Sequence, residues 1–255
     1  MAVVPAADAV RYHRRVHGRP TAAFDWAVGG AVIAAVAFAW LVYFRWKDHH
    51  PEPVRHIAGA LLLGVVAAGL ALALYAAVEA LGGPVAPGPT AASAWGFSLL
   101  VVGPVEEGAK WAVLVAVVTR WKAFDEEIDG LVYAATIALG FACVESLLYL
   151  PRLPWEGRVA RALSTPLSHA VFSSAFGFGV GHARFVATSR AARWGWPIAT
   201  LAVAALAHGV YDALILAHDA TLPAAVIVFA LWAVLVLRAR QIVARLELAA
   251  ARRHH

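Results

Sequence analysis

Cysteine and charge are both scarce in this sequence. A single cysteine, Cys143, occurs among 255 residues, which excludes an internal disulfide framework and a metal site built from several thiolates. Charged residues make up only 15% of the chain, whereas 62% are hydrophobic, which is too apolar for a soluble domain of this length. The alternation of polar and apolar residues that marks strands of a membrane barrel is also absent. These absences predict an all-α fold, a polytopic transmembrane helix bundle.

The apolar residues are grouped in runs long enough to cross the roughly 30 Å hydrocarbon layer as tilted helices. Breaks at charged or Pro/Gly-rich stretches separate these runs. We expect seven or eight spans, and the seven that can be delimited lie at about residues 24–44, 55–80, 94–119, 129–150, 163–183, 196–217 and 221–238. The run that begins near Phe24 is longer than the core of a signal peptide, so we expect it to remain uncleaved.

The chain divides into four parts by this pattern. They are a basic tail (1–23), two spans with a Pro/Gly-rich loop (24–93), a core that holds the chemistry (94–217), and a last span with a basic tail (218–255). No internal repeat or appended soluble domain is evident, so function is expected inside the bundle.

Charge in the loops predicts the topology. The uncharged loop at 82–90 is expected outside the cell, and the arginine-rich carboxyl tail inside. With seven spans, the basic amino terminus lies outside and the basic first loop lies in the cytoplasm. Basic residues favour the cytoplasmic side in both segments, so the two segments compete for it.

The net charge of +5 comes mainly from arginines at the ends of apolar runs, which anchor helices, so no nucleic-acid partner is expected. Alanine, arginine and tryptophan richness indicates a bacterium, and the bacterial cytoplasmic membrane is the expected location.

Ionisable side chains inside the spans carry most of the functional information. Each costs roughly 2.5 to 3.5 kcal/mol to insert, so those that remain usually face the bundle interior and mark a site or a relay. The set comprises Glu106, Glu107, Lys110, Asp129, Glu145, His169, His208 and Asp212.

The segment VEEGAKWAVL (105–114) holds two of these glutamates and the lysine. On a helix, Lys110 lies within reach of both Glu106 (i,i+4) and Glu107 (i,i+3), so one ammonium partly offsets two carboxylates. The remaining charge requires a proton, a metal or another cation, which suits a general base. Pro104 removes the hydrogen bond to Leu100 and is expected to open the helix nearby. The structural alternative is an ion pair that locks helix packing.

The later spans offer further polar groups. Glu145 lies roughly 24 Å along its helix from Asp129, so Glu145 is the better candidate for chemistry and Asp129 is either supporting or a helix-start residue. His169 heads a face of small residues that is expected to pack against another helix. His208 and Asp212 share a face at i,i+4, which would let Asp212 orient the imidazole.

Two chemistries remain open from the residues alone. One is a zinc-type site with His169, His208 and Glu145 as ligands and an open position for water. The other is metal-free hydrolysis, in which Glu106 or Glu107 activates water and the histidines stabilise the oxyanion. Ser–His nucleophilic catalysis is a weaker option, with Ser168, Ser173 and Ser174 as the serines close to His169.

The order of motifs resembles a known family. The motifs are EEGAK (106–110), DGLVY (129–133), GFACVES (140–146), Arg161, HAVFSSAFG (169–177) and HGVYD (208–212). Over about residues 94–217 the chain resembles the PrsW family of intramembrane proteases, distant relatives of the CAAX-processing and Abi-type membrane proteases, and the first two spans add little. The resemblance implies paired catalytic glutamates at Glu106 and Glu107, a third at Glu145, and two catalytic histidines at His169 and His208.

The resemblance also implies an activity and a class of partner. PrsW-like proteins are endopeptidases that act on membrane-associated substrates, of which an anti-sigma factor is the best-known kind. PrsW-type enzymes are classed as metalloproteases whereas the CAAX relatives look like glutamate proteases, so one divalent metal such as zinc, or none, is expected. The sequence departs from the family pattern at Ala134, where the family has glycine, and at Ser146, where it has asparagine.

We therefore predict an intramembrane endopeptidase in which Glu106 or Glu107 activates water, Lys110 tunes the pair and Asp212 orients His208. A proton- or cation-coupled transporter is the alternative, because chains of buried Glu, His and Asp also serve as relays. Clustering of the site residues in one place would favour hydrolysis, and a series strung across the membrane would favour transport. An inactive relative that only binds membrane partners is a third reading, which the cost of keeping the full set buried argues against.

Overall fold

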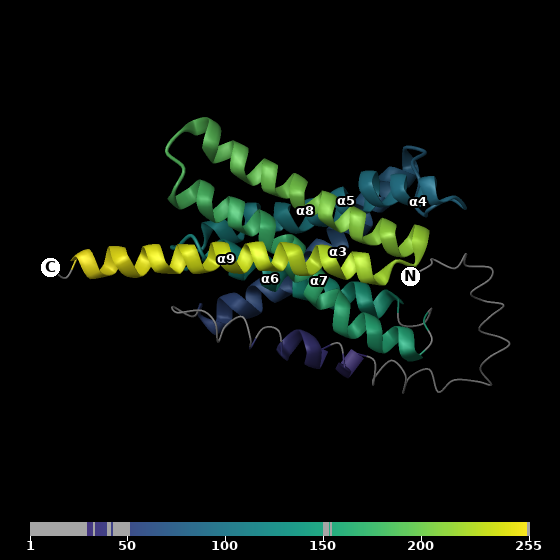
Figure 1. Cartoon of the computed structure of the whole chain (residues 1–255), viewed down its shortest axis with the longest axis horizontal. Coiled ribbons are helices and arrows are strands. Elements are labelled where there is room, and N and C mark those ends of the chain that lie inside the picture. The colour runs from purple at the N-terminus through teal and green to yellow at the C-terminus, as the bar shows by residue number, and fades with distance from the viewer. Residues whose placement is uncertain are drawn as a thin grey trace.

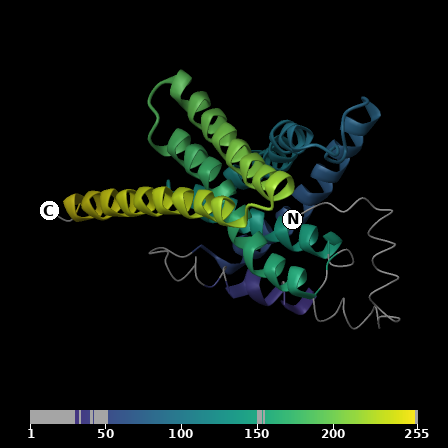
Figure 2. The same cartoon turned by 45° about the vertical axis from the view of Figure 1, so that its right-hand side comes forward.

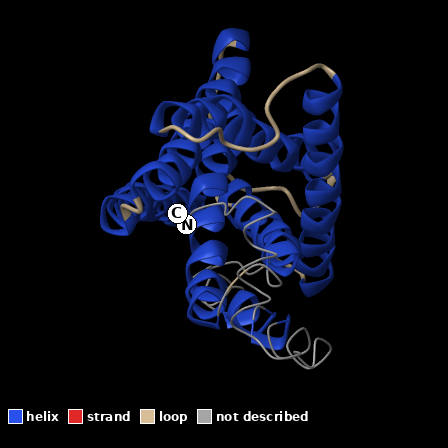
Figure 3. Cartoon of the chain, turned by 90° about the vertical axis from the view of Figure 1, so that its right-hand side faces the viewer, coloured by secondary structure: helices blue, strands red, loops and turns tan. Residues whose placement is uncertain are grey.

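The computed structural model of the chain describes residues 30–32, 34–39, 42, 52–149, 153 and 155–253. Among these residues all regular secondary structure is helical, without any strand (Figure 3). The predicted all-α fold is confirmed. The predicted amino-terminal tail and most of the first predicted span, 24–44, lie outside the described residues, as does the orientation of the amino terminus.

The bundle is built from seven α-helices with short irregular connections in the part of the chain that starts at residue 52. These are α3 (Val54–Ala80), α4 (Ala91–Phe97), α5 (Gly103–Ala116), α6 (Asp129–Tyr149), α7 (Trp155–Phe185), α8 (Arg190–His218) and α9 (Thr221–Arg253). A short 3₁₀ turn, Val118–Arg120, follows α5. Helix α6 lies at the centre, packed most extensively against α7 and α3, and α8 covers α7 and α5.

The ends of the helices fall on two sides of the bundle. The loop between α7 and α8 and the carboxyl end of α9 lie on one side, and the turn between α8 and α9 lies with α4 on the other (Figure 1). Helices α8 and α9 diverge from that turn, and α9 extends well beyond the other helices (Figures 1 and 2). This is the arrangement that the predicted alternation of loops requires.

Within the described residues, four helices are long and apolar enough to cross a membrane: α3, α6, α8, and α9 over Thr221–Leu248. They correspond to the predicted spans at 55–80, 129–150, 196–217 and 221–238. The predicted span at 163–183 lies within α7, a 31-residue helix that also contains charged residues. The chain is therefore an integral membrane protein, a bundle of apolar and partly polar helices.

The predicted span at 94–119 is not one α-helix. It consists of α4, a π-helical turn at Ser98–Val102, and α5, which ends at Ala116. Pro104 lies in the first turn of α5, where the missing backbone N–H interrupts the α-helical hydrogen bonds. The disturbance expected near this proline is therefore present, and it divides the segment immediately before Glu106.

Glycines bring the helices around this break into backbone contact. A Cβ atom at Gly103 would lie 2.1 Å from the carbonyl oxygen of Ala205, and one at Gly209 would lie 2.7 Å from that of Ser98. The start of α5 therefore packs directly against α8, which sets the glutamates of α5 opposite His208. The small face of α7 packs as predicted, because a Cβ atom at Gly177 would lie 2.3 Å from a backbone oxygen of α6.

Candidate active site

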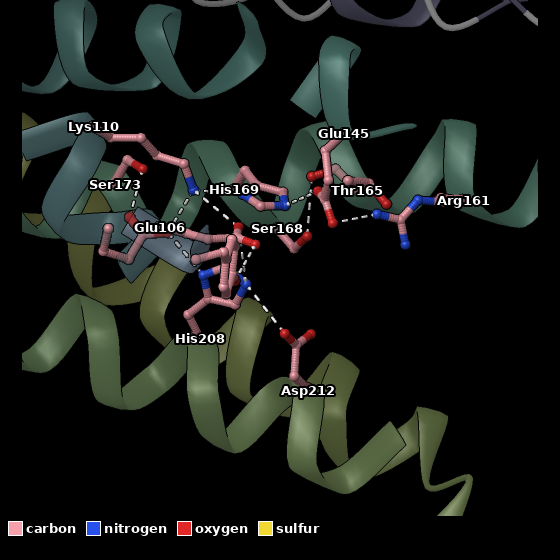
Figure 4. Close-up of polar contacts among 12 residues, drawn as sticks. Glu106, Lys110, Glu145, Arg161, Thr165, Ser168, His169, Ser173, His208 and Asp212 are labelled. Carbon is pink, nitrogen blue, oxygen red and sulfur yellow. Dashed lines mark hydrogen bonds and ion pairs between the residues drawn. The ribbon is translucent and has the colours of Figure 1, made fainter. Parts of the chain in front are cut away.

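Four helices bring almost all of the predicted polar residues together (Figure 4). Helix α5 contributes the glutamate pair and the lysine, α6 and α7 contribute a glutamate and a histidine, and α8 contributes a histidine and an aspartate. The cluster comprises Glu106, Glu107, Lys110, Glu145, His169, His208 and Asp212. Clustering in one place is the arrangement that favours hydrolysis over transport.

Glu107 is fully buried, and both of its oxygens are engaged. Its Oε1 accepts a hydrogen bond from Lys110 Nζ at 2.8 Å and lies 2.9 Å from Nδ1 of His208. Its Oε2 accepts a hydrogen bond from Ser173 Oγ at 2.8 Å. Glu107 therefore links α5, α7 and α8, and it has little capacity left to accept a further proton or ligand.

Glu106 differs from its neighbour because one oxygen is unengaged. Its Oε1 accepts a hydrogen bond from the Tyr75 hydroxyl at 3.1 Å. Its Oε2 is buried and makes no hydrogen bond within the described part of the chain, and it lies 3.9 Å from both Lys110 Nζ and His208 Nε2. A buried carboxylate oxygen of this kind is suited to hold a water molecule or a metal ion.

His169 is held from both sides. Its Nδ1 lies 2.7 Å from Lys110 Nζ, and its Nε2 lies 2.8 Å from Glu145 Oε2. Because a lysine ammonium only donates, Nδ1 must accept, which places the proton of the neutral ring on Nε2, next to Glu145. Glu145 is in turn paired with Arg161. The lysine and Glu145 together fix the tautomer of His169.

His208 has one engaged and one open nitrogen. Nδ1–H donates to Glu107, and Nε2 faces the cluster, 3.9 Å from Glu106 Oε2. Phe172 stacks on the ring with centroids 5.1 Å apart. Asp212, which was expected to orient this histidine, lies 3.5 Å from Nε2, and Glu107 makes the closer contact.

Exposure increases from one end of the cluster to the other. Glu107 and Lys110 are completely buried, whereas the side chains of Glu145 and Asp212 are 18% and 27% exposed. The exposed residues lie near the carboxyl ends of α6 and α8. The cluster is therefore more accessible at those helix ends than around Lys110.

Among the described residues, three could together hold a metal ion. Glu106, His169 and His208 each offer one ligand atom, and these atoms lie within 4.8 Å of one another. The predicted ligand set contained Glu145 in place of Glu106, but Glu145 faces Arg161 and His169 instead. A divalent cation suits this site, because the carboxylates outnumber Lys110 and Arg161 and Glu106 Oε2 is unengaged. Binding at His169 would require either Lys110 or Glu145 to give up its contact.

Asp129 lies apart from the cluster. Its Oδ2 accepts hydrogen bonds from the backbone N–H groups of Asp125 and Glu126 at 2.8 and 2.7 Å, so it stabilises the loop that enters α6. Asp129 is also the first residue of α6. Cys143 packs against a small apolar cluster around Ala162.

The serines near His169 do not form a nucleophile–base pair. Ser168 and Ser174 donate to the backbone carbonyls of Thr165 and Ala170, and Ser173 donates to Glu107. These contacts disfavour the Ser–His option.

Two members of the surroundings were not identified as site residues from the sequence. Tyr75 belongs to α3, an apolar helix without any motif, where a single tyrosine gives only a weak signal. Arg161 entered only as part of the family pattern, although an arginine near the end of a predicted span could have indicated a partner for Glu145.

Comparison with known proteins identifies the family. A model of the PrsW family intramembrane metalloproteases matches residues 52–238. The chain belongs to the PrsW family. It is 36% identical to Protease PrsW of Bacillus subtilis (strain 168) over 181 residues, which are 70% of this chain and 78% of that relative. It is also 36% identical to Protease PrsW of Geobacillus kaustophilus (strain HTA426) over 186 residues, 72% of this chain and 78% of that protein. No solved structure matches the chain.

Membership of the PrsW family makes the chain an intramembrane protease. The matched region begins at residue 52 and so includes α3. The expectation that the family region is confined to about 94–217 was therefore too narrow. This difference matters for the site, since α3 supplies Tyr75.

Proposed function

We propose that the chain hydrolyses a peptide bond of a membrane-spanning protein with a water molecule activated by Glu106, between His169 and His208. The observation that supports this assignment is the unengaged, buried Oε2 of Glu106 beside the open Nε2 of His208. Glu107 is the weaker candidate for the base, because its oxygens already accept hydrogen bonds from Lys110 and Ser173.

The residues of the cluster then have distinct roles. Glu106 accepts a proton from the attacking water and returns it to the leaving amine. Lys110, whose third donor hydrogen is not used by Glu107 or His169, offers positive charge and an N–H group near the oxygen that becomes negative, and His169 holds Lys110 in place. Glu107 holds His208 in the tautomer that keeps Nε2 open. Glu145, paired with Arg161, fixes His169.

A divalent metal would be held by Glu106, His169 and His208. When bound, such a metal supplies Lewis-acid polarisation of the scissile carbonyl and activation of the water. The contacts of Glu107 with His208 and of Glu145 with His169 then orient the two histidine ligands, as carboxylates outside a metal site commonly do.

The more exposed end of the cluster suggests where the substrate is cut. The carboxyl ends of α6 and α8 are on the extracytoplasmic side in the predicted topology, and these ends carry the more exposed Glu145 and Asp212. The substrate we propose is a single-span protein of the bacterial cytoplasmic membrane, such as an anti-sigma factor, cut in the outer part of its span. The catalytic unit is the proposed core at 94–217 together with α3.

The test compares cells that express the wild-type chain or its Glu106→Gln variant at matched levels. Newly formed amino termini in the membrane fraction are identified by mass spectrometry, with Glu79→Gln, an exposed glutamate at the end of α3, as the control. We expect a small set of termini that is present with wild type and Glu79→Gln and absent with Glu106→Gln. Identical sets of termini in all three would contradict the proposed function, and an assay of proton or metal flux would follow.

A further inference from the structure

Tyr75 contacts the site from a helix that carries no motif. Its hydroxyl donates a hydrogen bond to Oε1 of Glu106 at 3.1 Å, across 31 positions of sequence. The tyrosine ring packs against a small apolar cluster that includes Val101 and Val102 of the π-helical turn. The position of the hydroxyl is thereby fixed by both α3 and the segment that leads into α5.

The hydrogen bond determines the direction of the other Glu106 oxygen. A carboxylate is planar, so holding Oε1 toward Tyr75 restricts Oε2 to the opposite side, where Lys110 Nζ and His208 Nε2 each lie 3.9 Å away. At that distance neither group forms a hydrogen bond with Oε2. The oxygen remains available although two strong partners are close.

Without the tyrosine hydroxyl, Glu106 would have a more favourable alternative. Lys110 has three donor hydrogens, of which the contacts with Glu107 and His169 use two. Rotation of the Glu106 side chain would let Oε2 form a close ion pair with the third. A buried charge-assisted hydrogen bond of that kind is strong, and it would withdraw the oxygen from water or metal.

We propose that Tyr75 is a positioning residue for proteolysis, which keeps Glu106 Oε2 unpaired by holding Oε1. This inference rests on the proposed function of Glu106. It gives α3 a part in the reaction and predicts that removing one hydroxyl group slows turnover while binding of the substrate is unchanged.

The test uses the full-length purified chain in liposomes, with a single-span protein identified by the comparison of amino termini as substrate. Tyr75→Phe removes only the hydroxyl. Tyr133→Phe is the matched control, because Tyr133, which is fully buried, also donates to a carboxylate, that of Glu52, outside the cluster. We expect Tyr75→Phe to lower kcat about 10-fold to 100-fold with KM within about 2-fold of wild type, as misplacement of a reacting group does. Tyr133→Phe should retain the wild-type kcat per folded molecule.

The solvent deuterium isotope effect on kcat separates positioning from loss of folded protein, since a ratio does not depend on the active fraction. Slower activation of water should raise this ratio in Tyr75→Phe. A lowered kcat with an unchanged isotope effect and a lower Tm would assign Tyr75 a structural role and overturn the inference.

Glu106→Gln, measured in parallel, distinguishes the two proposals. Wild-type turnover in Tyr75→Phe beside an inactive Glu106→Gln overturns the role of Tyr75 alone. An active Glu106→Gln overturns the proposed function itself.

Discussion

Nδ1 of His208 lies 2.9 Å from Oε1 of Glu107, although the two residues are 101 positions apart. The same oxygen accepts a hydrogen bond from Lys110, one turn further along α5. This single carboxylate oxygen thus joins the lysine of one helix to the histidine of another, and it explains why the chain keeps a second glutamate beside Glu106.

Replacement of Glu107 by glutamine should impair catalysis without abolishing it. The glutamine amide keeps the shape of the glutamate side chain but loses the negative charge that both Lys110 and His208 contact. His208 is therefore oriented less well. We expect a loss of about 10-fold to 100-fold in kcat/KM, as is typical when a group that orients a ligand is removed. Cleavage by the reconstituted protein measures it, with Glu79→Gln as the control. Wild-type activity in Glu107→Gln would contradict the positioning role.

Breaking the ion pair between Lys110 and Glu107 should strongly destabilise the protein. Both side chains are fully buried, so Lys110→Met leaves Glu107 as an uncompensated buried charge, at a cost of about 3 to 5 kcal/mol. The Lys110→Met, Glu107→Gln double variant should lose less than the sum of the two single losses, because neither charge is then left alone. The free energies of unfolding of the wild type, the two single variants and the double variant, measured in detergent micelles, test this prediction. Additive losses would show that the two residues are not coupled.

The contact between α5 and α8 should tolerate no side chain at Gly103. An added Cβ would lie 2.1 Å from a backbone oxygen of α8, so Gly103→Ala must push the helices apart and separate Glu106 from His208. Gly108, on the same helix, has nothing within 4 Å of an added Cβ. We expect Gly103→Ala to lower both Tm and cleavage and Gly108→Ala to change neither substantially. Equal effects of the two substitutions would argue against this packing.

The metal content of the protein should depend on His208, which lies in the cluster, and not on His218, which lies on the same helix outside the cluster. We expect the purified wild-type chain to retain a divalent ion, measured by elemental mass spectrometry, and His208→Ala to lose it. His218→Ala is the control, because His218 is exposed on the same helix and belongs to no metal group. Dialysis against a chelator should abolish cleavage, and zinc should restore it. Equal metal content in wild type and His208→Ala would contradict metal binding at this site. Cleavage that survives chelation would indicate that the glutamate activates water without a metal.

The sequence predicts most of the cluster, because the cost of burying a charge can be assigned to each residue from its own span, without knowledge of how the helices pack. Every ionisable residue that the insertion cost selected, apart from Asp129, lies in the cluster, and the i,i+3 spacing predicts the contact between Glu107 and Lys110. The fold class and the apolar helices α3, α6, α8 and α9 follow from the same hydropathy pattern.

The contacts between residues of different helices could not be predicted from hydropathy or helical spacing. Helical spacing places Asp212 beside His208, but the backbone contact at Gly103 brings Glu107 closer. The break of the predicted span at 94–119 depends on a π-helical turn, and Pro104 indicates only that some irregularity occurs there. Tyr75 reaches Glu106 through the packing of α3, which no spacing in the sequence encodes.

The most direct test of the central claim is single-turnover cleavage by the purified Glu106→Gln variant in liposomes. The protein should remain folded, because Glu106 is less tightly engaged than Glu107, and no product should form over many wild-type half-times. Product formation by folded Glu106→Gln at even about a tenth of the wild-type rate, a difference of only about 1.4 kcal/mol in the barrier, would contradict the role of Glu106 as the group that activates water.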